Sequence, residues 1–348
     1  MMDLPTNYIG ASIFWLYNVL ALLFTGTTVW ALFRLYMSNA SRKKNTGFIV
    51  LFSVLATLSF ATTSNNMLEV LIQSFKQWSA GRDPAELQDL PLALWNWSIT
   101  SSMFQDFGEA IVADSGRFLW AQSALLATLS VFFFMGTEGR HRGIPHLWSF
   151  FCLSQILPIS FAQNLFYIAL LLAPEKPGQL HFNKSASVGS AGFYCICLAC
   201  AQLMAGTERL IPLILAARSA LMVPLFLKAG HHASNDPNDK VPIVRATGDE
   251  LQRIVLKTSM IMTGMKAYQA VQEDVSVPMI FSALTAHPAV ASLGYDFILS
   301  GLSFAAWTLI RPRSAARTPA TTATATKATP AATSRRSQGK SQGKKARS

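Results

Sequence analysis

The sequence has little charge. Only 14% of its 348 residues are charged, whereas charged residues make up roughly 25% of an average soluble domain. The hydrophobic fraction is 51%, and the mean hydropathy is positive at +0.31. This composition argues against a disordered chain and against an ordinary soluble globular protein. We therefore expect a chain that spends most of its length in lipid.

Cysteine and sequence motifs for cofactor binding are also scarce. The four cysteines lie inside apolar runs, which excludes a disulfide framework and favours small buried side chains. Cys195, Cys197 and Cys200 have no histidine or aspartate beside them, so we expect no metal site. There is no Walker A loop and no GxGxxG, HExxH or GxSxG motif. We expect an activity without a cofactor.

Acidic residues are missing from the end of the chain. The net charge is +11, and residues 311–348 contain many Lys and Arg but no Asp or Glu. The basic character therefore belongs to a tail and does not indicate a nucleic-acid-binding domain. Residues 314–348 also lack aromatic residues, Leu, Ile and Val, which predicts disorder. We expect two parts: a membrane bundle over 1–313 and a disordered tail over 314–348.

Long apolar runs predict the membrane spans. A helical span needs about 20 apolar residues. Seven runs meet this length or come close to it, and an eighth, 254–272, is doubtful because it contains Lys257, Lys266 and Gln269. The sequence therefore predicts an all-α, polytopic bundle of seven or eight transmembrane helices. The seven clearer runs cover 8–37, 47–61 with a polar continuation, 117–136, 147–173, 186–205, 210–227 and 291–310.

Positive charge predicts the orientation. Arg42, Lys43 and Lys44 follow the first run, and Arg140 and Arg142 follow the third. These loops should face the cytoplasm. Seven spans would then place the basic tail in the cytoplasm, and eight would place it in the lumen. We expect a multi-pass protein of the endoplasmic reticulum.

Acidic residues occur where lipid makes them expensive. At 100° per residue, Asp106, Glu109, Asp114 and Arg117 would share one face of a single helix. Asp296, inside the last run, is expected at the same membrane depth. A carboxyl kept neutral by an apolar site serves as a general acid. The alternative is that these acids mark the water interface or form structural hydrogen bonds.

Aromatic residues surround this acidic stretch. They indicate either an interfacial belt or a cavity whose ring faces stabilise a cation. As residues that bind a substrate we predict Arg117, Trp97, Phe104, Phe107 and Trp120.

Short stretches resemble a known family. Met103–Ile111, the following Arg-Phe-Leu-Trp, and His287–Asp296 are similar to stretches in fungal integral-membrane proteins that include terpene cyclases of meroterpenoid and sesquiterpenoid pathways. The resemblance covers roughly residues 90–310. It implies a cofactor-free cyclase that protonates an epoxide or alkene of a farnesyl-type polyprenyl chain. It also implies that Glu109 and Asp296 are catalytic acids, together with Asp106.

Other interpretations stay open. Acids inside spans also line the paths of transporters, and a non-catalytic membrane protein is a third class. The partners we expect are a lipophilic polyprenyl substrate and membrane lipid, not nucleic acid. Asn96 and Asn183 lie in glycosylation sequons on predicted lumenal loops.

Overall fold

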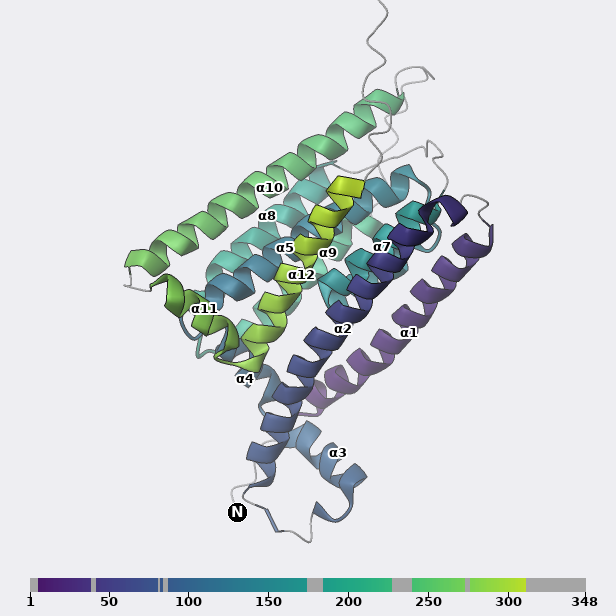
Figure 1. The fold of residues 1–348 in the computed structure, drawn as a ribbon. Coiled ribbons are helices and arrows are strands. Elements are labelled where there is room, and N and C mark those ends of the chain that lie inside the picture. Colours follow the sequence, from purple (N-terminus) through teal and green to yellow (C-terminus); the bar gives the residue numbers. More distant parts are fainter. Residues whose placement is uncertain are drawn as a thin grey trace, which may run out of the picture. The chain divides into compact units, whose positions relative to one another are not determined.

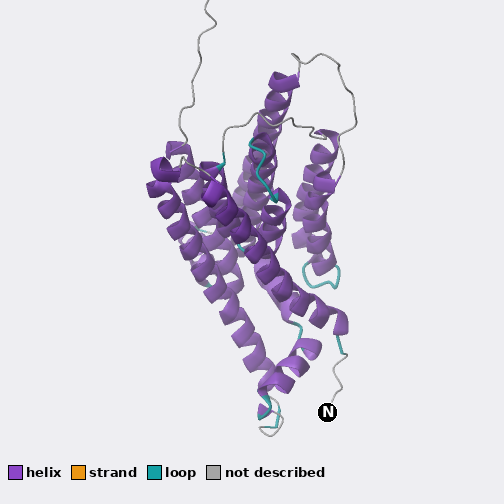
Figure 2. Cartoon of the chain, turned by 90° about the vertical axis from the view of Figure 1, so that its right-hand side faces the viewer, coloured by secondary structure: helices purple, strands orange, loops and turns teal. Residues whose placement is uncertain are grey.

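The computed structural model describes residues 6–38, 42–80, 82–83, 87–173, 184–226, 240–272 and 276–310. All regular elements in these ranges are helices, so the prediction of an all-α fold is confirmed (Figure 2). The contacts between residues divide the chain into two units, Met1–Ile310 and Arg311–Ser348. The basic tail predicted over 314–348 lies outside the described residues.

Five helical segments in the described part are long and apolar enough to cross a membrane. This composition supports a multi-pass membrane protein. They lie in α1 (Tyr8–Ser38), α2 (Arg42–Ser79), α5 (Ser115–His141), α8 (Lys184–Ala201) with the short η2 (Gln202–Met204), and α12 (Pro288–Ile310).

The other helices are shorter or more polar. Three are apolar but short: α6 (Leu147–Ile156), α7 (Ile159–Leu172) and α9 (Leu210–Phe226). The doubtful run 254–272 lies inside the long α10 (Lys240–Gln272). The remaining elements are α3 (Leu90–Thr100), α4 (Met103–Val112), α10 (Lys240–Gln272) and α11 (Val277–Thr285).

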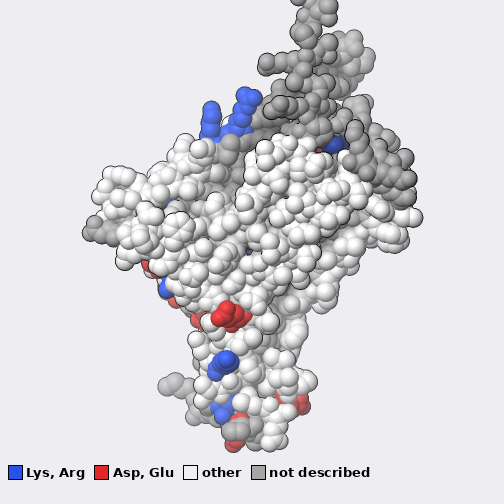
Figure 3. All heavy atoms as spheres, in the orientation of Figure 1, with Lys and Arg blue, Asp and Glu red and all other residues white. Residues whose placement is uncertain are grey.

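The centre of the bundle is α5, which packs against α7, α10 and α12 (Figure 1). Most of the apolar window of α5 is buried, whereas only 6% of the corresponding window of α1 is. Leu16, Val19 and Leu22 of α1 are exposed although they are apolar. Such a surface is stable only against lipid or another protein. Figure 3 shows that most of the face drawn carries neither acidic nor basic side chains.

The predicted span 147–173 is not one helix, so that prediction is wrong. Leu157 and Pro158 are extended and separate α6 from α7. The rings of Phe150 and Phe166 are 5.7 Å apart, whereas one straight helix would separate these residues by about 24 Å. The chain therefore turns back at Pro158, because proline lacks the N–H that would continue the helix.

Both ends of this α6–α7 hairpin lie at one end of the bundle. Arg142, at the end of α5, donates a hydrogen bond to the carbonyl oxygen of Leu170 (3.0 Å). Asn45, near the start of α2, donates to the carbonyl oxygen of Leu171 (3.1 Å). The hairpin tip, Leu157 and Pro158, consequently lies inside the bundle.

Candidate functional site

Asp296 of α12 is buried at the hairpin tip, with 6% of the residue exposed. Its Oδ2 accepts a hydrogen bond from the N–H of Ile159 (2.8 Å). Its Oδ1 accepts one from the N–H of Ser160 (2.9 Å) and another from the Ser160 hydroxyl. Asp296 thus caps α7 from a different helix.

This contact has a simple physical reason. The first N–H groups of a helix have no partner within the helix. In an apolar bundle each unpaired group costs free energy, and Pro158 offers no side-chain acceptor. A carboxylate supplies the acceptors, and its charge complements the positive end of the helix dipole. A proton added to Asp296 would have to compete with three donors, so the geometry suits an anchoring carboxylate.

Polar contacts continue from the tip along α7 and α12. The Ser300 hydroxyl donates to Oε1 of Gln163 (2.5 Å), and the Gln163 amide donates to the hydroxyl of Tyr167 (2.7 Å). The Tyr167 ring stacks on Trp307, with centroids 4.7 Å apart and planes 7° from parallel. These contacts join the hairpin to the last helix.

Arg218 also belongs to this region, and the sequence analysis did not single it out. It is the central residue of the otherwise uncharged α9, about 12 Å from either helix end. Arg218 interacts electrostatically with Asp296 and with Tyr17 of α1, and Tyr17 also interacts with Asp296. A lone arginine in an apolar run is the signal that could have found it.

A small cavity lies beside Arg218, between α5, α8 and α9. In its wall, the Tyr194 hydroxyl donates to the carbonyl oxygen of Leu125 (2.9 Å). Nε of Arg218 is buried and has no hydrogen-bond partner. The lining residues are Leu125, Tyr194, Cys197, Leu198, Ala201, Leu213, Ile214, Ala217 and Arg218.

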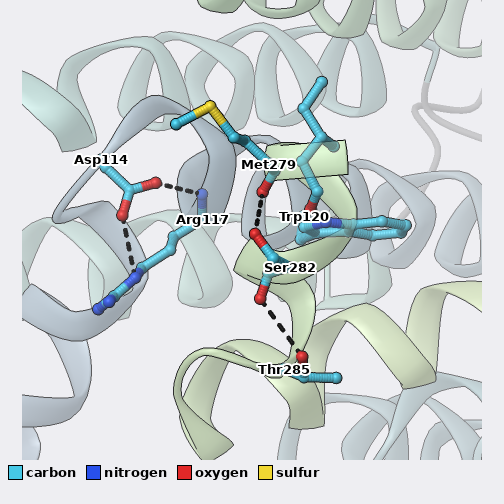
Figure 4. A network of polar contacts seen from close by, with 7 residues as sticks. Asp114, Arg117, Trp120, Met279, Ser282 and Thr285 are labelled. Carbon is cyan, nitrogen blue, oxygen red and sulfur yellow. Dashed lines mark hydrogen bonds and ion pairs between the residues drawn. The ribbon is translucent and has the colours of Figure 1, made fainter. Parts of the chain in front are cut away.

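The predicted acidic helix is interrupted, so its four charged residues do not share one helical face. The first helix, α4, ends at Val112, and Asp114 caps the start of α5. Oδ1 of Asp114 accepts from the N–H of Arg117 (2.8 Å), and Oδ2 pairs with its Nε (2.9 Å) (Figure 4). The expectation failed because the Asp-Ser-Gly sequence after Ala113 favours a new cap over a continued helix.

Asp106 and Glu109 have local partners within or beside α4. Asp106 is exposed and accepts from the Ser102 hydroxyl (2.8 Å), and Glu109 accepts from the Gln105 amide (3.0 Å). No hydrogen bond or ion pair joins either acid to Asp296 in the described ranges. The buried face of α4 consists of Met103, Gly108, Ile111 and Val112.

Trp120 lies between α11 and α12. Its indole N–H donates to the carbonyl oxygen of Ile280 (2.8 Å). Figure 4 shows Trp120 together with the Asp114–Arg117 pair. Its ring lies 6.2 Å from Phe281 and 6.4 Å from Phe297. These three rings lie close to the level of Asp296, the residue before Phe297.

The other predicted aromatic residues lie elsewhere. Trp97 is buried between α1, α2 and α3, where it donates to Ser74 (3.2 Å) and contacts the rings of Phe14 and Phe75. Phe107 packs against the core cluster around Phe118 and Val290.

Phe104, the last of the predicted aromatic residues, is half-buried in α4. Of the predicted aromatic set, Trp120 is the one whose ring contacts a neighbour of Asp296 in α12.

His287 marks the end of the bundle at which α5 and α12 begin. Its Nδ1 accepts from the N–H of Ala289 (3.1 Å). Partial burial lowers the pKa of His287; nearby Arg117 lowers it further, and Glu69 opposes the shift. Groups from α2, α5 and the start of α12 therefore meet here.

The remaining predicted sites are the two glycosylation sequons. Asn96 lies within α3, where its carbonyl oxygen accepts from Thr100 (2.7 Å), and the sequon hydroxyl of Ser98 accepts from Trp15 (3.2 Å). Asn183 lies outside the described residues.

In the described part, no group of three His, Cys, Asp or Glu side chains could hold a metal ion.

No protein-family model, curated protein or solved structure matches the chain.

Proposed function

We propose that the protein is a membrane-bound terpene cyclase of secondary metabolism, acting on a farnesyl-type polyprenyl substrate. The observation that carries this proposal is the group of rings of Trp120, Phe281 and Phe297 in an apolar bundle, next to the buried Asp296. A lipophilic substrate would reach such a site from the bilayer. The resemblance of 103–111 and 287–296 to fungal membrane cyclases supports the same activity.

The reaction balances without a cofactor. An acid donates a proton to an epoxide oxygen or a terminal alkene carbon, and the resulting cation is attacked by internal double bonds. Carbon–carbon bonds form, and a neighbouring carbon then loses a proton. The net change is an isomerisation. Aromatic faces stabilise the intermediate cation, and an apolar site keeps water from quenching it.

Glu109 is the proposed proton donor, because its partner is a neutral amide whereas Asp296 already accepts from three donors. Asp106, three residues before Glu109 on α4, is the second candidate acid. Asp296 holds the hairpin that forms the floor of the site. Phe281, Phe297 and Trp120 are the candidate cation-stabilising rings.

The test is expression in a microsomal host fed with linear and epoxidised farnesyl-phenol substrates, with products identified by mass spectrometry. Glu109→Gln should abolish cyclisation at an unchanged protein level. The control is Glu208→Gln, which changes an exposed carboxylate in the turn before α9. Full activity of Glu109→Gln removes Glu109 from the mechanism. If Asp106→Asn and Asp296→Asn were fully active as well, the proposal that one of these carboxylic acids starts the cyclisation would fail. Absence of any cyclised product from the wild-type protein would contradict the cyclase proposal itself.

We also infer seven membrane crossings, formed by α1, α2, α5, α8, α9, α10 and α12. The α6–α7 hairpin returns to its starting side. The Lys266 ammonium of α10 lies 5.0 Å from the Phe118 ring near the start of α5, which supports a crossing by α10. Residence in the endoplasmic reticulum and glycosylation at Asn96 belong to this proposal. Asn183 lies between α7 and α8, so in this topology it is on the cytoplasmic side and should stay unglycosylated. Endoglycosidase sensitivity in microsomes tests both.

A transporter is the second candidate, and the α6–α7 hairpin favours it. Helix ends inside the membrane line the solute sites of transporters. Proteoliposomes distinguish the two functions. Uptake of a solute without turnover of polyprenyl substrates supports the transporter, and turnover without uptake supports the cyclase.

A further inference from the structure

Two hydroxyls of α2 are buried without a hydrogen-bond partner. They are Oγ of Ser59 and Oγ1 of Thr63, which meet no donor or acceptor in the part of the chain that the structure describes. The exposed Ser53 and Thr57 behave differently, because they donate to carbonyl oxygens four residues earlier in α2, at 2.8 and 3.0 Å. Hydroxyls on the lipid side are thus satisfied by their own helix, whereas the two buried ones are not.

The buried hydroxyls face α7 and α12, the helices against which α2 mainly packs. Figure 1 shows α2 and α12 running in opposite directions. The rings of Phe52 and Trp307 are 6.1 Å apart. Thr63 follows Phe52 by 11 residues, and Asp296 precedes Trp307 by 11 residues. Thr63 and Asp296 therefore lie at the same level of the bundle, with Ser59 about one turn away.

Asn164 of α7 supplies a third free oxygen. Its amide N–H donates to the carbonyl oxygen of Ser160 (2.7 Å), so this side chain reaches back to the turn that Asp296 caps. Its Oδ1 is buried and has no partner among the described residues. Asn164 lies between Phe161 and Tyr167, whose rings contact rings of α2 at 5.3 and 5.0 Å. Its free oxygen is therefore on the side of α7 that faces α2.

Asp296 adds a negative charge and a fourth oxygen. A carboxylate offers about four lone-pair sites. The bonds from Ile159 and Ser160 use three of them and leave one on Oδ2. Arg218 interacts with Asp296 electrostatically, but within the described ranges no cation forms an ion pair with this carboxylate. A buried carboxylate without a direct counter-ion favours the approach of a cation.

We propose that the oxygens of Ser59, Thr63, Asn164 and Asp296 bind a sodium ion at the tip of the α6–α7 hairpin. Hydroxyl, amide and carboxylate oxygens are the ligands of hard cations. Such a site does not need the cluster of His, Cys, Asp or Glu that the described part lacks. A single positive charge matches the one carboxylate, whereas a divalent ion would leave excess charge in the apolar bundle.

The place in the fold suits this ligand. Helix ends that meet inside a membrane bind the coupling ions of transporters. The ion would also remove the cost of burying three oxygens without partners. This site goes beyond the cyclase proposal, because sodium binding is measured without turnover and stands or falls independently of it.

The test is the thermal midpoint of the full chain in detergent, followed by tryptophan fluorescence. Sodium chloride replaces choline chloride at constant ionic strength. A ligand that binds the folded state raises the midpoint in a saturable way. We expect such a rise with sodium and none with potassium, a larger ion for these tightly packed helices.

Conservative variants identify the site. Thr63→Val keeps the shape of the side chain and should weaken the apparent sodium affinity by at least about tenfold, as should Ser59→Ala. Asp296→Asn should abolish the sodium-dependent rise. Thr57→Val makes the same chemical change on the exposed side of α2 and should keep the wild-type response. Thr63→Val and Ser59→Ala keep the test decisive if Asp296→Asn fails to fold.

Three results would overturn the proposal. The wild type unfolds at the same temperature in sodium and choline chloride, potassium raises the midpoint as much as sodium does, or Thr63→Val responds to sodium like the wild type. If Thr63→Val lowers the midpoint equally in both salts while its sodium response persists, the hydroxyl serves the fold and not an ion.

Discussion

Asp296 and Ser160 are separated by 136 residues and form two hydrogen bonds, from the backbone N–H and from the hydroxyl of Ser160 to Oδ1 of Asp296. The carboxylate thereby fixes the start of α7 to α12. A helix that begins inside an apolar bundle needs such an acceptor. The acid that the sequence marked as a candidate proton donor therefore has a structural task as well.

Removing the carboxylate should destabilise the bundle. Asp296→Ala leaves the N–H groups of Ile159 and Ser160 without acceptors, which should lower the unfolding free energy by about 2–5 kcal/mol. Asp296→Asn keeps one oxygen and should cost less. Thermal unfolding in detergent, followed by tryptophan fluorescence, measures both variants. Equal stability of Asp296→Ala and the wild type would mean that the cap contributes nothing.

The stability of the start of α5 should depend mainly on the Asp114 oxygen that accepts from the Arg117 N–H, and little on the Asp114–Arg117 ion pair. Asp114→Ala should cost about 0.5–2 kcal/mol, the range for a lost N-cap. Asp114→Asn keeps the acceptor for the Arg117 N–H and loses only an exposed salt bridge, worth at most about 1 kcal/mol. The same unfolding assay compares the pair, and a larger loss in Asp114→Asn than in Asp114→Ala contradicts the assignment.

Protonation of His287 should weaken the fold at acidic pH. Its pKa is lower in the folded protein than the ordinary 6.5, so the unfolded chain binds the proton more tightly. The contribution of His287 to stability is therefore complete above 6.5 and is lost as the pH falls from 6.5 through the folded pKa. Thermal midpoints between acidic and neutral pH should show a flatter profile for His287→Asn, which keeps an acceptor for Ala289.

Close packing of α11 on α12 requires a glycine at 294. A Cβ added there would lie 2.1 Å from Cδ1 of Leu284. Gly294→Ala should destabilise the protein by about 1–3 kcal/mol through overpacking. Adding Leu284→Ala should restore part of the loss, and purely additive destabilisation in the double variant would show that this contact is not the cause.

The fold class followed from composition, because low charge and long apolar runs leave few alternatives to a bundle of membrane helices. The hairpin did not follow, since a helix that crosses the bilayer and a pair that turns back have similar hydropathy. Pro158 was visible in the sequence, but proline also occurs in kinked spans.

The candidate site was only partly predictable for a related reason. Asp296 stood out as an acid in an apolar run, yet its partners come from α7 and leave no local pattern. The shared face expected of Asp106, Glu109 and Arg117 assumed an unbroken helix, and the cap at Asp114 breaks it. Arg218 was detectable as a charge in an apolar run.

The α6–α7 hairpin has a consequence for biosynthesis. The acceptors for the N–H groups of Ile159 and Ser160 come from a helix made more than a hundred residues later. Until α12 emerges from the ribosome, the tip of the hairpin has no partner within the chain and is unstable in hydrocarbon. The hairpin should therefore stay near the membrane surface during synthesis and enter the bundle last, so a chain truncated before Asp296 would leave an open bundle for the quality-control machinery to remove.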